Sequence, residues 1–354
     1  MRAKKFLFLL IIFATVVIYF SCEQGGVNPY SIAKGRIILS VKNLPTLNQN
    51  IDGMYAAWLR IDTPGMPLIY HLGYFNIDAG GNPVDSTGGA ITFTYNGDTN
   101  ILHLSTHCFV TVEPPDKTGY PSTAILLDDV LRQQDDSLLG DMTIGGPFAL
   151  GQAGQDLMHA NVPAHYMVMS QTSTNNACNP PGDGYKGLWL CDTAGNSLIP
   201  NLGVLPSNGG WMYEAWLADT LATGGPYYYS IGKFFNINSP IHPGGIYNAY
   251  WDNCRGPNPP EHDKIGQDWI GTGCFINPAA PQITTVADGH HQVFITIEPE
   301  SERSNEPSYQ KPFPFKIFRQ TVISTTINCR VTTDNLFNTA VMGLYPSAHV
   351  NIKD

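Results

Sequence analysis

Short runs of apolar, β-branched and aromatic residues alternate with turn-forming residues along most of this 354-residue chain. The runs at residues 35–41, 109–112 and 294–297 have the length and composition of strands rather than helices. Turn signals such as Asn96-Gly97 separate such runs. Short strands separated by turns predict an all-β protein, built as antiparallel β-sandwiches of the Ig-like kind.

The strand pattern occurs twice, in the same order. The offset between the copies is 158 residues at the tryptophans and 185 at the Glu-Pro pairs, so the second copy holds an insertion of 27 residues. The matched segments are 54–62 with 212–219, 72–77 with 231–237, 108–114 with 293–299, and 164–166 with 348–350.

The duplication predicts two tandem β-sandwich domains. The first spans residues 33–171 and the second spans 184–354. A stretch rich in Ser, Thr, Asn, Pro and Gly, residues 172–183, is the predicted linker. The insertion in the second copy corresponds to a loop at about 238–286.

Residues 1–21 have the pattern of a signal peptide. Basic residues precede an apolar stretch at 6–20, which at about 15 residues is shorter than the span of about 20 that a bilayer requires. Ser21 followed by Cys22 resembles the bacterial lipobox, in which the cysteine receives a lipid. The chain is therefore predicted to be a lipoprotein anchored through Cys22, with a tether at 22–32. A cleaved signal without lipid and an uncleaved N-terminal anchor are the alternatives.

The charge balance restricts the partners. Residues 1–21 hold three basic and no acidic residues, so their removal takes the formal net charge from −10 to −13. An acidic chain with scattered basic residues argues against nucleic acid as a partner. Glu23, directly after Cys22, favours the outer membrane or the cell surface over the inner membrane. The expected partners are the lipid bilayer, through Cys22, and an envelope protein or a glycan.

Six cysteines remain if Cys22 carries lipid, an even number that permits disulfides in an oxidising compartment. Cys108 lies in a strongly apolar strand and is expected to be a buried free thiol or a partner of Cys329. The other four flank two long loops and are candidate disulfide cysteines: Cys178, Cys191, Cys254 and Cys274.

The ordered motifs resemble the anti-sigma-K factor C-terminal domain, an extracytoplasmic β-sandwich, and duplicated domains of this kind in bacterial lipoproteins. An anti-sigma factor also needs a cytoplasmic sigma-binding domain, and here the signal opens the chain, so we expect only the exported module to be shared. The residues that carry the resemblance are Tyr55, Trp58, Glu113 and Pro114 in the first copy, and Tyr213, Trp216, Glu298 and Pro299 in the second.

Each motif residue has a structural and a chemical interpretation. The Tyr and Trp pairs are expected to pack in the core and to find a partner for their polar atoms. Glu113 and Glu298 each precede a proline at a strand end, where a carboxylate can hydrogen bond to loop backbone or act as a general acid. Because the carboxylate occurs in both copies, we favour the structural role and predict no catalytic residue.

The inserted loop of the second copy offers the main candidates for ligand binding. Its aromatic residues are available to stack on sugars or to contact a protein, or they form a small core of the loop itself. Histidines in this part of the chain (His242, His262, His290 and His291) lack the spacing of a metal-binding motif. Asp78, Asn82 and Asp85 could supply oxygen ligands to calcium, but they are also ordinary turn residues. The candidate ligand-binding aromatics are Tyr247, Tyr250, Trp251 and Trp269.

The sequence thus predicts a non-enzymatic cell-envelope lipoprotein that acts as a binding, structural or sensory module. No cofactor or metal is expected, because the fingerprints for nucleotides, dinucleotides and hydrolytic nucleophiles are missing from the sequence. The two alternatives are a carbohydrate-binding surface protein that uses the loop aromatics and a metal-dependent hydrolase that uses the loop histidines.

Overall fold

The computed structural model describes residues 36–116, 119–159, 166–168, 188–190, 202–206, 209–221, 223–236, 286, 289–300, 311–319, 337–338 and 345–353. Strands make up 49% of these residues, and the sheets are antiparallel. The predicted all-β class is therefore confirmed. Within the described residues, no helix combines the length and hydropathy needed to cross a bilayer.

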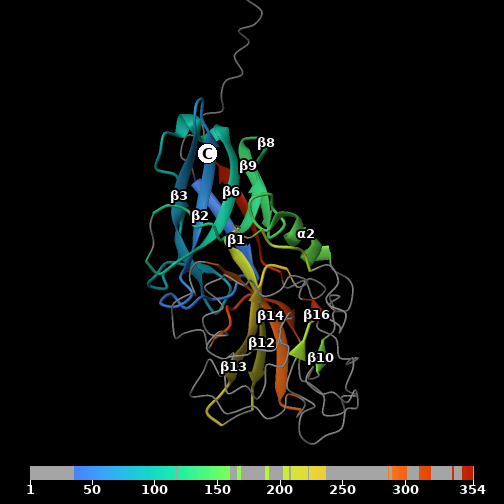
Figure 1. Cartoon of the computed structure of the whole chain (residues 1–354). Helices are drawn as coiled ribbons and strands as arrows, with labels where there is room; N and C mark the ends of the chain where they lie inside the picture. Colours follow the sequence, from blue (N-terminus) through green and yellow to red (C-terminus); the bar gives the residue numbers. More distant parts are fainter. Residues whose placement is uncertain are drawn as a thin grey trace, which may run out of the picture.

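The first sheet has ten strands in the order β4-β3-β2-β6-β7-β9-β17-β1-β5, with β8 paired to β9 (Figure 1). The helices η1 (Thr99–Leu104) and α2 (Gly151–His159) flank it. The strands are β1 (Arg36–Lys42), β2 (Met54–Asp62), β3 (Pro67–Ile77), β4 (Pro83–Val84), β5 (Phe93–Thr94), β6 (Ser105–Glu113), β7 (Ile125–Val130), β8 (Arg132–Gln134), β9 (Ser137–Thr143) and β17 (Ser347–Lys353).

The remaining strands form a five-stranded sheet, ordered β13-β12-β14-β15-β16, and the two-stranded pair β10-β11. They occupy the lower half of the molecule in Figure 1. Their bounds are β10 (Met167–Val168), β11 (Leu188–Trp189), β12 (Trp211–Asp219), β13 (Tyr227–Phe234), β14 (His291–Pro299), β15 (Lys316–Arg319) and β16 (Phe337–Asn338).

The ten-stranded sheet curls so that its two ends approach each other. Phe75 on β3 meets Phe93 on β5 edge to face, with ring centroids 5.6 Å apart. The ring centroids of Tyr70 and Tyr95 lie 4.5 Å apart, with the rings tilted by 53°. The two ends of the sheet thereby enclose a core of alternate residues from each strand, because successive side chains of a strand point to opposite faces.

The sequence repeat corresponds to a repeat of strand pairing. Trp58 on β2 is opposite Phe109 on β6, and Trp216 on β12 is opposite Phe294 on β14. On the other side, the β2–β3 and β12–β13 pairings both shift register immediately before the tryptophan. A shared bulge position indicates that the two hairpins have the same local twist and aim their side chains in the same way.

The last strand of the chain lies inside the first sheet. All seven residues of β17 pair with β1 on one side and with β9 on the other. Ala348, Val350 and Ile352 point into the core and are buried. Although β17 falls within the second predicted domain, 184–354, it hydrogen bonds between strands of the first, so the two halves of the chain build this sheet together.

The strand β10, at the end of the first copy, makes the reciprocal pairing. Met167 is opposite Trp189, at the start of the second copy, as Asn351 of β17 is opposite Ile38 of β1. The sequence match between 164–166 and 348–350 places Met167 at the position of Asn351. Each copy therefore pairs its first strand with the last strand of the other copy.

A close contact at the centre of the molecule also joins the two halves. The indole nitrogen of Trp211, the first residue of β12, donates to the carbonyl of Ile125 at 2.9 Å. Gly210 has a φ of +75°, and a Cβ there would lie 2.4 Å from the carbonyl carbon of Thr123. Only glycine fits this position, because the positive φ disfavours any residue with a side chain and because a Cβ would clash with the backbone of Thr123.

We expect Ile352→Ala to destabilise the first sheet by about 2–5 kcal/mol, because a fully buried aliphatic side chain is lost from a central strand. Chemical denaturation measures the loss, and amide exchange in β1 and β9 locates it. His349→Gln is the control: it changes an exposed side chain of the same strand and should alter the stability by no more than about 1 kcal/mol. Equal effects of the two substitutions would show that β17 does not close the sheet.

Candidate functional site

The motif residues of the first copy form a buried chain of hydrogen bonds. The indole nitrogen of Trp58 donates to Thr111 Oγ1 at 2.8 Å, and the Thr111 hydroxyl donates to Glu113 Oε1. The same carboxylate oxygen accepts the backbone N–H of Ser122 at 2.9 Å. The chain therefore runs from β2 across β6 to the segment that precedes β7.

The second copy repeats this arrangement. Trp216 Nε1 donates to Thr296 Oγ1 at 3.0 Å, and Thr296 donates to Glu298 Oε1 at 2.9 Å. Glu298 Oε1 also accepts the backbone N–H of Phe313 at 3.1 Å, shortly before β15. We call each set a Trp–Thr–Glu tie: Trp58, Thr111 and Glu113 in the first copy, and Trp216, Thr296 and Glu298 in the second.

Both ties are closed to solvent. Glu113 is 1% exposed, Glu298 is 0% exposed, and the two tryptophans are each 1% exposed. A buried carboxylate is stable only when hydrogen bonds or an opposite charge replace its hydration. The Glu residues thus hold the strand to the following loop through backbone N–H groups, which is the structural role that the sequence favoured for them.

The second tie carries charges that the first lacks. Lys233 Nζ lies 3.5 Å from Glu214 Oε2 and 3.4 Å from Glu298 Oε2, and the side chains of all three are at most 9% exposed. In the first copy, the strand register puts Ala56 and Tyr74 at the positions of Glu214 and Lys233. A buried ion pair contributes little net stability against apolar packing. This charged group is therefore a specialisation of the second copy and no requirement of the fold.

The motif tyrosines have equivalent partners as well. The hydroxyl of Tyr55 donates to the carbonyl of Pro45 at 2.9 Å, and that of Tyr213 donates to Gly203 at 3.0 Å. Each bond joins the central strand to the segment that leads into it. Burial raises the pKa of both phenols well above the usual value, so both act as neutral donors.

We expect Thr111→Val and Thr296→Val each to cost about 1–3 kcal/mol, because each removes a hydroxyl that serves a buried indole N–H and a buried carboxylate. Valine keeps the shape of threonine, so the loss reports the hydrogen bonds. Chemical denaturation measures it, and Thr94→Val, at an exposed site on β5, is the matched control. Destabilisation of one sheet only would contradict the equivalence of the two ties.

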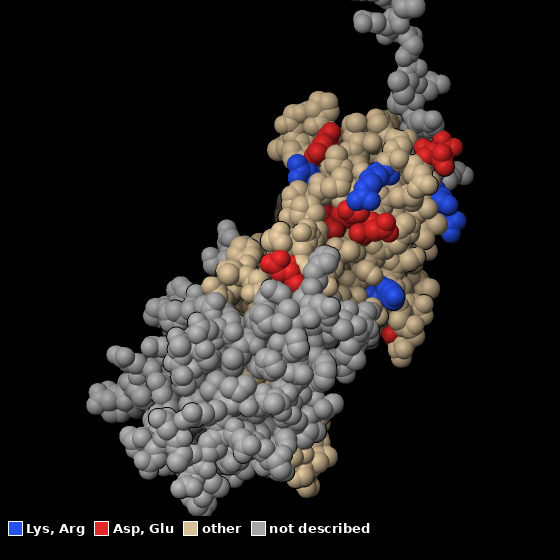
Figure 2. Space-filling model, turned by 90° about the vertical axis from the view of Figure 1, so that its right-hand side faces the viewer, with Lys and Arg blue, Asp and Glu red and all other residues tan. Residues whose placement is uncertain are grey.

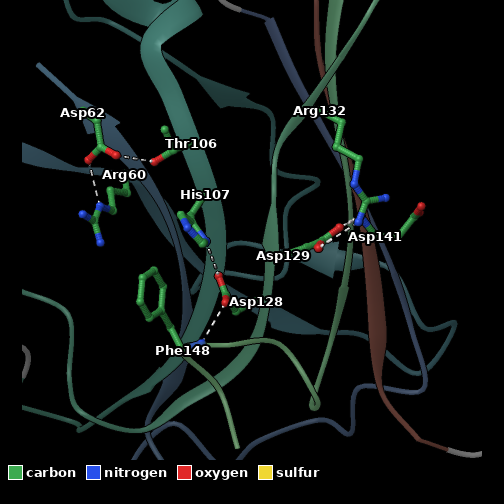
Figure 3. A network of polar contacts seen from close by, with 9 residues as sticks. All are labelled: Arg60, Asp62, Thr106, His107, Asp128, Asp129, Arg132, Asp141 and Phe148. Carbon is green, nitrogen blue, oxygen red and sulfur yellow. Dashed lines mark hydrogen bonds and ion pairs between the residues drawn. The ribbon is translucent and has the colours of Figure 1, made fainter. Parts of the chain in front are cut away.

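A second polar cluster, which sequence reasoning missed, lies on the outer face of β2, β6 and β7 (Figure 3). His107 Nδ1 is 3.3 Å from Asp128 Oδ1, and the backbone N–H of Phe148 donates to Asp128 Oδ2 at 2.9 Å. The centroid of the Phe148 ring lies 4.4 Å from that of the His107 ring and 5.5 Å from the guanidinium carbon of Arg60. Each member comes from a different segment, so spacing in the sequence gave no sign of it.

The cluster fastens a loop to the sheet. One oxygen of Asp128 accepts the Phe148 N–H, the other lies next to the His107 ring nitrogen, and the side chain is fully buried. Burial raises the pKa of this carboxyl above its usual value, although the Phe148 N–H and His107 both favour the charged form. A His–Asp pair is a geometry that general bases use, but here its carboxylate positions the residues before α2.

Charged side chains beside this cluster pair with one another. Asp129 accepts the backbone N–H of Asp141 at 2.7 Å and lies 3.5 Å from Arg132. Asp141 in turn lies 2.8 Å from His349 on β17. On the face shown in Figure 2, acidic and basic side chains of the described residues lie close together among uncharged ones. Exposed pairs of this kind contribute little to stability and leave no large area of one charge.

The raised pKa of Asp128 predicts a specific pH dependence. Since the folded state binds this proton more tightly than the unfolded state, whose pKa is about 4, stability should fall as pH rises from about 4 through the folded-state pKa. Asp128→Asn keeps an acceptor for the Phe148 N–H and should remove this slope. The test is to measure the free energy of unfolding of both proteins as a function of pH. A wild-type stability that rises with pH relative to that of Asp128→Asn would contradict a raised pKa for Asp128.

The aspartates proposed as calcium ligands accept hydrogen bonds within their own turns. Asp78 Oδ1 accepts the backbone N–H groups of Gly80 and Asn82 at 2.8 Å, and Asp85 Oδ1 accepts those of Thr87 and Gly89. The backbone hydrogen bonds lower the pKa of the Asp78 carboxyl, and the Thr87 hydroxyl together with the backbone N–H groups lowers that of Asp85, as expected for Asx turns. In the part of the chain that the structure describes, no three metal-binding side chains gather at one point.

Cys108 is a buried free thiol, so the first of its two predicted alternatives is confirmed. Burial raises its pKa, which makes it a poor nucleophile. His291 lies buried on β14. The remaining predicted residues lie outside the described part of the chain: Cys22, Cys178, Cys191, Cys254, Cys274, Cys329, Tyr247, Tyr250, Trp251, Trp269, His242 and His262.

Three comparisons with known proteins were made, and none found a match. No family model, no curated protein and no solved structure matches the chain. The likeness to the anti-sigma-K factor C-terminal domain stays a prediction that depends on the motif residues alone.

Proposed function

We propose that the protein is a non-enzymatic cell-envelope lipoprotein, anchored through Cys22, whose two Ig-like β-sandwich units serve as a binding or structural module. The observation that carries this proposal is the presence of two Trp–Thr–Glu ties. The residues that most resembled a catalytic motif are buried and use their polar atoms to hold strands together. The repeated Trp, Thr and Glu residues therefore have a structural role.

The shape of the molecule also supports the proposal. The described chain enters at Arg36, at the upper end of an elongated molecule, and the five-stranded sheet lies at the other end (Figure 1). An anchor on Cys22 would hold the upper end near the membrane and leave the lower half extended away from it. The outer membrane is the proposed location, on the basis of Glu23 after the cysteine.

Mass spectrometry of the mature protein tests the anchor. We expect the N-terminal residue to be Cys22 with a lipid attached, and the Cys22→Ala protein to leave the membrane fraction because its attachment point is lost. Cys108→Ala is the matched control, since it removes a buried thiol and should stay in the membrane fraction with the lipid in place. A mature N-terminus at another residue, or one without lipid, would refute the proposal.

A further inference from the structure

The turn between β2 and β3 and the first three residues of β3 expose an uninterrupted run of uncharged residues. All six residues at positions 64–69, with the sequence PGMPLI, are exposed. Met66 is 75% exposed, Leu68 is 42% exposed and Ile69 is 39% exposed. We call residues 64–69 the hairpin tip. Consecutive exposed apolar residues are uncommon on soluble proteins, and where they occur they indicate a contact surface.

The equivalent hairpin of the second sheet provides an internal comparison. Among its described residues, the turn between β12 and β13 has one large exposed hydrophobic residue, Leu221, at 68%, while Thr220 and Thr223 are polar. The two hairpins share their strand register and bulge. The apolar tip is therefore a property of the first hairpin and does not follow from the shared strand geometry.

Arg60 and Asp62, the charged residues that precede the hairpin tip in the sequence, pair with each other. Asp62 accepts a hydrogen bond from Arg60 Nε at 2.9 Å and from the Thr106 hydroxyl at 3.1 Å (Figure 3). The Thr63 hydroxyl donates to the carbonyl of Met66 at 2.6 Å, which occupies a polar group of the turn. Internal pairing of this kind lowers the cost of moving the tip into a less polar environment.

The hairpin tip lies at the end of the molecule where the described chain begins. Ile61, at the end of β2, is opposite Ser105 at the start of β6, and Arg36 is opposite Lys353 at the end of β17. Figure 1 places the β2–β3 turn and the end of β17 together at the top, and the β12–β13 turn at the bottom. The 14 Cα-to-Cα steps from Cys22 to Arg36 span at most about 50 Å, so a lipid on Cys22 keeps the tip within reach of the bilayer.

We infer that the hairpin tip inserts into the surface of the bilayer that anchors Cys22. This inference rests on the proposed lipid anchor and adds a second point of contact to it. The anchor raises the effective concentration of the tip at the membrane, so a small apolar surface is sufficient for contact. Two contacts at one end fix the orientation and direct the β12–β13 turn away from the membrane.

Site-specific photocrosslinking of the full lipidated chain tests this inference. Benzoylphenylalanine replaces Met66 in one protein and Leu221 in another, and each protein is reconstituted in vesicles of phosphatidylethanolamine and phosphatidylglycerol. Both positions are exposed, so neither replacement should disturb folding. We expect lipid adducts at position 66, in several-fold excess over position 221, as detected by mass spectrometry of the tryptic peptides.

The outcomes separate the inference from the proposal on which it rests. If Cys22 carries lipid but position 66 gives no lipid adduct, or no more than position 221, the inference fails and the anchor stands. Adducts to a protein in native membranes, without lipid adducts, would assign the hairpin tip to a protein partner and also overturn the inference. A chain without lipid on Cys22 would refute both.

Discussion

The structure depends on the requirement that a buried carboxylate be hydrogen bonded. Glu113 and Glu298 lie at the C-terminal ends of β6 and β14, as the last and the penultimate residue, and both are buried. At Oε1 each meets the requirement in the same way, with a threonine two residues earlier on its own strand and a backbone N–H from the segment that follows. Because the threonine also accepts the indole N–H of the neighbouring strand, each tie joins two adjacent strands and the segment that follows the second of them.

The second constraint is the pairing of the chain ends. β17 supplies a central strand of the first sheet, and β10 pairs with the opening strand of the second copy. Neither copy is therefore complete on its own strands, and the Trp211–Ile125 hydrogen bond joins the halves where they meet. The β1–β17 pairing thus joins the first and the last described segments of the chain.

Local pattern and repetition were sufficient to predict the strands and the equivalence of the motif residues. The alternation in β1 and the matched MYxAW and FxTxE segments are properties of short stretches, which sequence shows directly. The exchange of β17 and β10 could not be predicted, because each repeat offers the same pairing surface and only the connecting chain decides which copy is used. The His107–Asp128–Phe148 cluster was missed for a related reason: its members are separated in sequence and converge only through the order of β6, β7 and β9.

The indole N–H groups of Trp58 and Trp216 give the most direct test of the account, which holds that the repeated motif is a pair of equivalent, solvent-excluded ties. Hydrogen exchange of both groups can be followed by nuclear magnetic resonance in one uniformly labelled sample. The account predicts slow exchange for both, with each accelerated when the threonine of its own tie is replaced. Fast exchange of either indole in the intact protein would contradict it, since that group would then be open to water.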